Sequence, residues 1–416
     1  MTLLFADSFD HYDLFTEKWS FSAWVNAPSA LAARTGINGR RVTNEQAAQL
    51  NSPIFTNTTT LIMGRGYRFS SLAAGNGAYP IWHTFSADLG SSEGSLVNDA
   101  TGKLICRRDI TVVATSTLTA ASTATWYFIE FKHFIDDAAG LLECRVDGVT
   151  FATFTGDTLA TNGHLDGVKA FAHINTGNVD DDDVYICNGE GTANNNYLYD
   201  ISGGGLATGL EVRTLLPTGA GTTTEWTPSA GSNFQNVDEA NQDDDTTYNS
   251  TTVQDEIDLY AMTDLADTPI IQAIQYLAWW RDEAAGNTAL QRIIRTGGTN
   301  YTGSSVDPAV TYAYTREVIE TSPATLLQWT KAAIDAIETG AKYTAAGSPT
   351  IARVSQVVIE VVASGAAIGG GGGGGGGKGG GKGGGKGGGK GGGKGGGDKA
   401  IDRFAFDKRW VGSLRW

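Results

Sequence analysis

One hairpin signal constrains the fold of this chain more than any other feature of its sequence. Residues 142–146 and 149–153 alternate apolar with other side chains, and Asp147-Gly148 joins the two runs. Such alternation places every second side chain on the same face of a strand. An Asp-Gly pair between alternating runs favours a hairpin, because a type I′ turn needs positive φ at both central residues. These residues therefore predict two antiparallel strands.

The first 205 residues show the same period of two elsewhere. Ile129, Phe131 and His133 share one predicted strand face, and Glu130 and Lys132 lie on the other. His133 therefore continues an apolar face, which favours a core residue over a catalytic base. Many short strands without a long helix predict an antiparallel sandwich of two sheets. Further strands are predicted over residues 59–69, 103–114, 168–174 and 183–187.

A second β-rich region is predicted over residues 206–366. It also contains one helix signal, in which Thr330 can serve as N-cap, Ile334 and Ile337 share one face, and Gly340 is placed to end the helix. These features predict an α+β domain with one packed helix. Its strand-like runs cover residues 210–216, 270–279, 290–295 and 353–362.

The composition changes after residue 366. Residues 369–397 contain 24 of the 56 glycines and otherwise only lysines. Ordering such a segment would cost some tens of kcal/mol, at roughly 1–2 kcal/mol per residue, and glycine buries no side chain in return. We therefore predict a coil linker over residues 367–397, the alternative being a polyglycine II-type bundle with other chains. Its lysines follow a four-residue period: Lys378, Lys382, Lys386, Lys390 and Lys394.

Residues 398–416 combine aromatic and basic side chains at the end of this linker. The simplest interpretation of an apolar segment at the end of a long linker is a docking peptide. The residues expected to make the contact are Phe404, Phe406, Arg409, Trp410, Leu414 and Trp416.

Charge divides the chain in the same place. Residues 1–368 carry 20 Lys+Arg and 42 Asp+Glu, a net charge of −22, whereas residues 369–416 carry 10 and 3, a net charge of +7. An acidic body repels polyanions, so we expect it not to bind nucleic acid. No run of 18 apolar residues occurs, and Glu360 interrupts the most apolar stretch, so we expect no membrane span.

The N-terminus and the cysteines exclude further classes. The N-terminal residues are acidic where a signal peptide needs positive charge, so Sec-type export is not expected. Cys106, Cys144 and Cys187 are odd in number and lack CxxC spacing. They fit neither a disulfide framework nor a zinc site, and we expect buried, inert thiols.

Several phrases of the sequence together resemble a structural protein family of tailed-bacteriophage virions. The likeness covers roughly residues 1–365 and lies in the order of the phrases. The residues after it have no counterpart in the family. The phrases are LLFADSFDHYD, WYFIEFK, VDGVTF, VDDDDVYICNGEGTANNNYLYD, LEVRTLLPTGAG, EWTPSAGSNFQNVDE, DEIDLYAMTDL and SPATLLQWTKAAIDAIETG.

This resemblance implies an N-terminal concanavalin A-like jelly roll over residues 1–205, followed by the second domain. It implies attachment or decoration of a virion without catalysis. We accordingly expect a fibre, spike or surface decoration that assembles in the host cytoplasm as a homo-oligomer. Its expected partners are other virion proteins, such as capsid, portal or tail components, together with glycans of the host surface.

Two acids resemble the start of a glucanase motif. Glu256 and Asp258 are two apart, so in a strand they would share a face, as the carboxylates of a retaining glycosidase must. The motif needs a further Glu, however, and residues 260–262 are Tyr, Ala and Met. We therefore expect no enzyme, and keep a jelly-roll glucanase-type hydrolase as the alternative. A cell-surface adhesion module is a third hypothesis.

Two acidic runs are candidates for a calcium site. Asp180, Asp181, Asp182 and Asp183 precede a predicted strand, and residues 243–245 lie in a polar loop. Calcium binds six to eight oxygen ligands, but neither run has EF-hand spacing. The favoured interpretation is a solvated turn, and calcium is the only cofactor considered.

The tryptophans are candidates for sugar platforms. Trp279 and Trp280 are adjacent, so at most one of them can offer an outward face on a strand, and Trp280 is the candidate. Trp19 and Trp24 are weaker candidates. Core packing is the favoured interpretation for most of these side chains.

Overall fold

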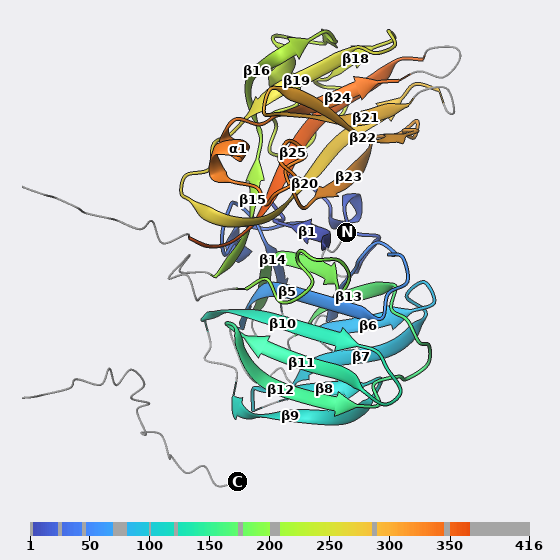
Figure 1. The fold of residues 1–416 in the computed structure, drawn as a ribbon, viewed down its shortest axis with the longest axis vertical. Helices are drawn as coiled ribbons and strands as arrows, with labels where there is room; N and C mark the ends of the chain where they lie inside the picture. The colour runs from blue at the N-terminus through green and yellow to red at the C-terminus, as the bar shows by residue number, and fades with distance from the viewer. Residues whose placement is uncertain are drawn as a thin grey trace, which may run out of the picture. The chain divides into compact units, whose positions relative to one another are not determined.

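The computed structural model describes residues 3–23, 27–43, 47–69, 81–99, 101–119, 124–173, 178–199, 209–284, 289–344 and 350–366. The strands within these ranges form four antiparallel sheets (Figure 1). The described residues form one compact unit, and residues 370–416 lie outside the described ranges. The protein is therefore mainly β, as predicted.

Two seven-stranded sheets make the first sandwich. The first sheet has the order β1-β14-β5-β10-β11-β12, with β3 also paired to β14, and the second has the order β2-β4-β13-β6-β7-β8-β9. The first sheet comprises β1 (Leu3–Asp7), β3 (Arg40–Thr43), β5 (Thr60–Phe69), β10 (Trp126–Phe134), β11 (Gly140–Val146), β12 (Val149–Gly156) and β14 (Asn178–Asn188). The second comprises β2 (Phe21–Ala23), β4 (Ala47–Asn51), β6 (Trp82–Ser86), β7 (Ser91–Asn98), β8 (Lys103–Arg108), β9 (Thr111–Thr119) and β13 (Gly167–His173).

The predicted alternation fills the core between these two sheets. Ile129 and Phe131 of β10 are buried there with Leu142 and Cys144 of β11. The hairpin prediction is confirmed, since the turn residues Asp147 and Gly148 have φ values of 49° and 77°. The single strand predicted over residues 103–114 is wrong. It divides into β8 and β9 at a turn where Asp109 has a φ of 49°.

A six-stranded and a five-stranded sheet make the second sandwich. The third sheet has the order β17-β18-β25-β20-β23, with β15 also paired to β25, and the fourth has the order β16-β19-β24-β21-β22. The third sheet comprises β15 (Leu210–Leu215), β17 (Thr227–Pro228), β18 (Asn249–Thr251), β20 (Pro269–Asp282), β23 (Ala313–Ile319) and β25 (Ala352–Ala366). The fourth comprises β16 (Pro217–Thr224), β19 (Ile257–Met262), β21 (Leu290–Thr296), β22 (Thr299–Val306) and β24 (Glu338–Tyr343).

One short helix, α1 (Lys331–Asp335), packs on this sandwich. Thr330 caps it as predicted, with its hydroxyl accepting a hydrogen bond from the Ala333 N–H. The prediction that Gly340 ends the helix is wrong. Gly340 lies in β24, where a Cβ would overlap the carbonyl oxygen of Asp258, so the glycine allows close strand packing. Three 3-10 helices, η1 (Phe15–Glu17), η2 (Ala30–Ala32) and η3 (Asn233–Asn236), complete the regular elements of the described ranges.

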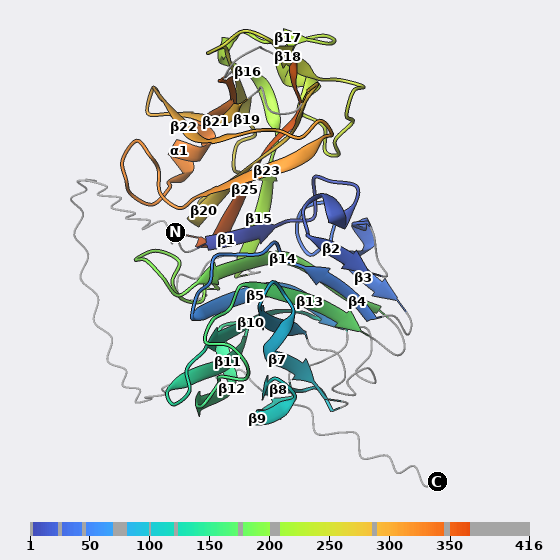
Figure 2. The same ribbon diagram turned by 90° about the vertical axis from the view of Figure 1, so that its right-hand side faces the viewer.

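The third sheet is buried on both faces. Val357, Ile359 and Val361 of β25 face the core shared with the fourth sheet. Val362 of β25 belongs instead to a separate apolar cluster that includes Phe128 of β10. This cluster joins the outer face of the first sheet to the third sheet, where β1 and β14 lie beside β15 and β25 (Figure 2). The two sandwiches thus share an apolar contact, which we call the junction.

The two-domain division at residues 205 and 206 stays a prediction. The strands up to residue 188 belong to the first sandwich and those from residue 210 belong to the second. The predicted boundary itself falls outside the described ranges. No helix among the described residues is long and apolar enough to span a membrane.

Candidate functional site

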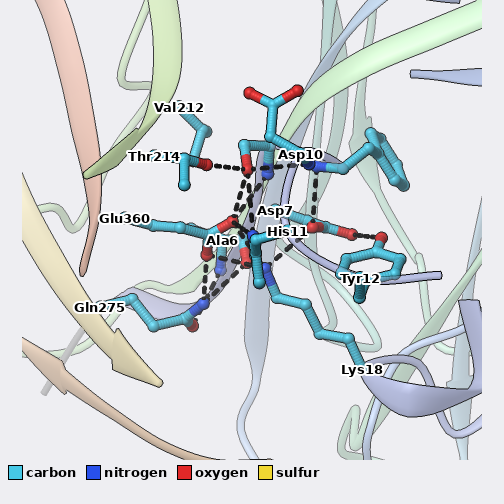
Figure 3. A network of polar contacts seen from close by, with 12 residues as sticks. Ala6, Asp7, Asp10, His11, Tyr12, Lys18, Val212, Thr214, Gln275 and Glu360 are labelled. Atoms are coloured by element: carbon cyan, nitrogen blue, oxygen red, sulfur yellow. Dashed lines mark hydrogen bonds and ion pairs between the residues drawn. The ribbon is translucent and has the colours of Figure 1, made fainter. Parts of the chain in front are cut away.

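The junction encloses a buried glutamate. Glu360 lies on β25 between apolar neighbours, and alternation turns it away from the core of the second sandwich, toward the first (Figure 3). Its side chain is fully buried, as is that of Asp7 at the end of β1. An isolated carboxylate in such a place would be very costly, so each needs partners.

Lys18 bridges these two carboxylates. It follows η1 directly, and its ammonium group donates to both Glu360 oxygens at 2.7 Å and to Asp7 Oδ1 at 2.8 Å. Neutral donors complete the shell of Glu360, through Ser8 at 2.9 Å and Gln275 at 2.7 Å. A buried ion pair is tolerated when its remaining lone pairs are also hydrogen-bonded, as they are here.

Asp7 is held equally firmly from its other side. Its Oδ2 accepts hydrogen bonds from the Tyr12 hydroxyl at 2.7 Å and the Trp19 indole N–H at 2.6 Å. Trp19, a weaker candidate for a sugar platform, is 1% exposed and so serves as a core residue. The other weak candidate, Trp24, lies outside the described ranges. We call Asp7, Ser8, Lys18, Gln275 and Glu360 the junction network.

His11 borders the junction network but is fully buried. Burial, reinforced by the charge of Lys18, lowers its pKa well below the usual value, so the ring is neutral. Its backbone carbonyl accepts from the Tyr314 hydroxyl at 2.8 Å and from Gln356 at 3.0 Å. His11 therefore acts as a link between the sandwiches, and its chemistry is that of a neutral side chain.

Two clefts open at the junction. The first has a volume of about 440 Å³ and is lined by Asp10, Ile37, Arg213, Leu216 and other residues. Burial raises the pKa of Asp10 to about 7, although the N–H groups of Ile37 and Asn38 donate to it at 2.7 Å. Arg213 pairs with Glu211 and Asp267, so its charge is neutralised within the protein.

The second cleft has a volume of about 490 Å³ and lies beside Lys18. Its other walls come from Glu17, Trp19, Ser20 and Pro53 of the first sandwich and from Leu277, Tyr314, Thr315 and Arg316 of the second. The Glu17 carboxylate accepts the backbone N–H groups of Asp13 and Leu14. Unlike the first cleft, it contains a guanidinium group that forms no ion pair with any described residue, as set out below.

The acidic run of residues 180–183 does not form the predicted solvated turn. All four side chains are buried within β14. Asp180 pairs with Arg41 and Arg68, Asp181 with Arg40 and Arg65, and Asp183 with Arg34. Asp182 instead accepts the backbone N–H groups of Arg34 and Thr35, at 2.7 and 3.2 Å.

These arginines occupy the oxygens that a calcium ion would need. No group of three or more His, Cys, Asp or Glu side chains among the described residues is arranged to hold a metal ion. In the second acidic run, Asp244 accepts the Trp279 indole N–H at 2.7 Å, and Asp245 pairs with Arg281 and Arg353. The geometry of both runs therefore favours structural roles over calcium binding.

The two acids that resemble the start of a glucanase motif, Glu256 and Asp258, are each bonded to different structural partners. Asp258 lies on β19, fully buried, and accepts from Asn233 at 2.7 Å and from the Tyr260 hydroxyl at 2.8 Å. Burial raises its pKa to about 6. Glu256 precedes β19 and accepts from the Thr251 hydroxyl. Both acids are bonded to structural partners, which gives the hydrolase alternative no support.

The prediction that Trp280 is an outward sugar platform is wrong. Its side chain is 1% exposed in the core of the second sandwich, and its indole N–H donates to Thr315 at 2.8 Å. Trp279 is also buried. The register of β20 shifts between the two residues, so strict alternation does not hold there.

Other predicted residues lie where expected. His133 is fully buried, its Nδ1 is 2.8 Å from the Thr84 hydroxyl, and burial lowers its pKa to about 3. Cys106, Cys144 and Cys187 are buried free thiols. The lysines of the Gly/Lys linker and the six residues of the docking peptide lie outside the described ranges and stay predictions.

The junction network is absent from the sequence-based candidates. Two polar residues inside apolar runs could have indicated it. Glu360 lies in the β-branched run VVIEVV, and Gln275 lies in another largely apolar run. Alternation could have placed both on one outer face of the third sheet. Nothing in the sequence pairs that face with Asp7 and Lys18, more than 340 residues away along the chain.

No family model matches this sequence, and no curated protein does. Among solved structures, the chain is similar to domain 4 of AbnA, an extracellular arabinanase from Geobacillus stearothermophilus, with 13% identity over 44% of this chain and 92% of that one, at a TM-score of 0.29. The globular domain of T. cruzi calreticulin shows 10% identity over 43% and 88% at 0.30. The carbohydrate recognition domain of Emp46p shows 11% over 35% and 78% at 0.26. Likenesses this weak carry no argument about this chain.

Proposed function

We propose that this chain is a non-enzymatic structural component of a bacteriophage virion, a fibre, spike or surface decoration that assembles as a homo-oligomer with other virion proteins. The sequence resemblance supports the assignment to a virion. The observation that supports a structural role is the junction network, in which buried ionisable groups join two sandwiches. Groups that are fully bonded to one another rigidify a fold and are not free for chemistry.

Anchoring by the C-terminal peptide belongs to the same proposal. The aromatic and basic residues of 398–416 bind the particle, and residues 367–397 act as the tether. The N-terminal jelly roll, residues 1–205, then contacts glycans on the host surface. Fold analogy alone supports that contact, and function must be argued from sites.

Particle composition tests this proposal. Mass spectrometry of purified virions from a phage that encodes the chain is expected to find it, and immunolabelling of residues 1–20 would locate it. Deletion of residues 398–416 is expected to abolish incorporation while the purified protein keeps its wild-type circular dichroism spectrum. Absence of the full chain from particles contradicts the virion role. Normal incorporation of the truncated chain contradicts the anchor alone.

A further inference from the structure

Arg316 differs from the other arginines around it. Eleven arginines in the described ranges form ion pairs with Asp or Glu. The side chain of Arg316 on β23 makes no hydrogen bond or ion pair to any described residue. Its guanidinium group lies over the Phe5 ring, 5.0 Å from the ring centre, and lines the second cleft.

The charge of Arg316 persists at neutral pH. Burial lowers its pKa to about 10, partly offset by attraction to Glu360 and Asp7. Those two carboxylates are already bonded to Lys18, Ser8, Gln275, Tyr12 and Trp19. Arg316 therefore contributes long-range charge to the junction network, while no residue of the described ranges accepts from its side-chain N–H groups. Five donors in a planar fork match a carboxylate in two-point geometry.

The other walls of the cleft suit a hydroxylated ligand. Ser20 is exposed and its hydroxyl donates to the Ser52 carbonyl at 2.6 Å, which leaves its lone pairs free to accept. Thr315 also lines the cleft, but its hydroxyl faces the core of the second sandwich, where it accepts from the Trp280 indole N–H at 2.8 Å. Pro53 adds an apolar surface. The volume of about 490 Å³ falls within the usual range for small-ligand sites, roughly 300–1,000 Å³.

We propose that the second cleft binds an acidic saccharide, with Arg316 holding its carboxylate and Ser20 bonding one of its hydroxyl groups. The proposal rests on the glycan contact in the proposed function and is independent of virion incorporation. Because the body of the chain is strongly acidic, long polyanions are repelled. A short oligosaccharide with one carboxylate in the cleft is the ligand that this charge distribution favours.

Titration of the purified full chain with tetragalacturonate, followed by NMR or calorimetry, tests the proposal. Neutral galactotetraose is the matched ligand control, and tetraglutamate is the control for an acidic protein segment. We expect tetragalacturonate to bind at least tenfold more tightly than either. No binding, equal binding of the neutral sugar, or equal binding of tetraglutamate would each overturn the assignment.

Two variants locate the site. Arg316→Gln is expected to weaken binding about 10- to 100-fold, the range for a lost charged hydrogen bond, and Arg316→Lys to restore only part of it. Ser20→Trp fills the cleft from an exposed position and is expected to abolish binding with an unchanged far-UV circular dichroism spectrum and an unchanged urea midpoint. If Arg316→Gln is folded and binds like wild type, or if a folded Ser20→Trp does so, the cleft is not the site. Arg316→Gln is expected to enter particles normally, so a failure of the virion role leaves this test unaffected.

Discussion

Two buried glutamates on different sheets show how the same side chain can be accommodated in two ways. Glu360 at the junction is bonded to the ammonium of Lys18. Glu130 of β10 accepts only from neutral groups, the Tyr185 hydroxyl and the N–H groups of Leu198 and Tyr199 at 3.1 and 3.0 Å. Burial accordingly raises the pKa of Glu130 to about 7.

The partners of Glu130 and Glu360 differ because the two sheets are covered in different ways. Residues 197–199 follow β14 within the same sandwich and cover Glu130, whereas Glu360 comes from the other sandwich. A buried ion pair requires one precise geometry. It therefore fixes the relative orientation of two packed bodies more than it adds to their stability. Buried ionic groups have this role in some proteins. We infer that the junction network fixes the relative placement of the two sandwiches.

Removal of the cation that bridges Glu360 and Asp7 is expected to have the largest effect on stability. Lys18→Met leaves Glu360 and Asp7 buried without their cation, which is expected to lower the free energy of unfolding by about 3–5 kcal/mol. Urea denaturation followed by fluorescence measures it from the first unfolding transition of the variant, because each transition is treated as a separate two-state change. A loss below 1 kcal/mol would show that the network is not needed for stability.

The neutral surroundings of Glu130 are expected to make the free energy of unfolding depend on pH. Folding raises the pKa of Glu130 from 4.5 to about 7, so the folded chain binds this proton more tightly than the unfolded chain. Its contribution to stability is therefore fully present below pH 4.5 and is lost as the pH rises through 7. Glu130→Gln keeps an acceptor but cannot ionise. From pH 4.5 to 8, wild type is expected to lose on the order of 3 kcal/mol relative to this variant.

Unfolding of both proteins across that pH range measures the difference and cancels the contributions of other acids. Parallel stability curves would contradict the buried environment described for Glu130, in which neutral groups donate its hydrogen bonds.

An exposed ion pair provides the smallest effect and the matched control. Arg108 pairs with Asp157, with side chains 31% and 50% exposed. Arg108→Met removes the same kind of charge as Lys18→Met but is expected to cost less than about 1 kcal/mol, because water screens exposed pairs. A loss as large as that of Lys18→Met would mean that burial does not explain the junction effect.

The sequence predicted what depends on local alternation. The Asp147-Gly148 turn, the three buried cysteines and the Thr330 cap needed only neighbouring residues. Residues 180–183 were misread because their arginine partners come from three other segments of the chain. Gly340 was misread because its reason, contact with Asp258 on another strand, is non-local.

The candidate site was harder to predict for the same reason. Alternation marks Glu360 as an outward acid, and an outward acid is usually solvated. Only the packing of the first sheet against the third reveals that this face is buried. Such pairings between distant segments cannot be read from one sequence by period alone.

Differential scanning calorimetry of the full chain tests the central claim that the junction makes the two sandwiches one cooperative body. Wild type is expected to unfold in a single transition whose calorimetric and van't Hoff enthalpies agree. Lys18→Met is expected to separate it into two transitions, one for each sandwich. Two independent transitions in the wild-type chain would contradict the account.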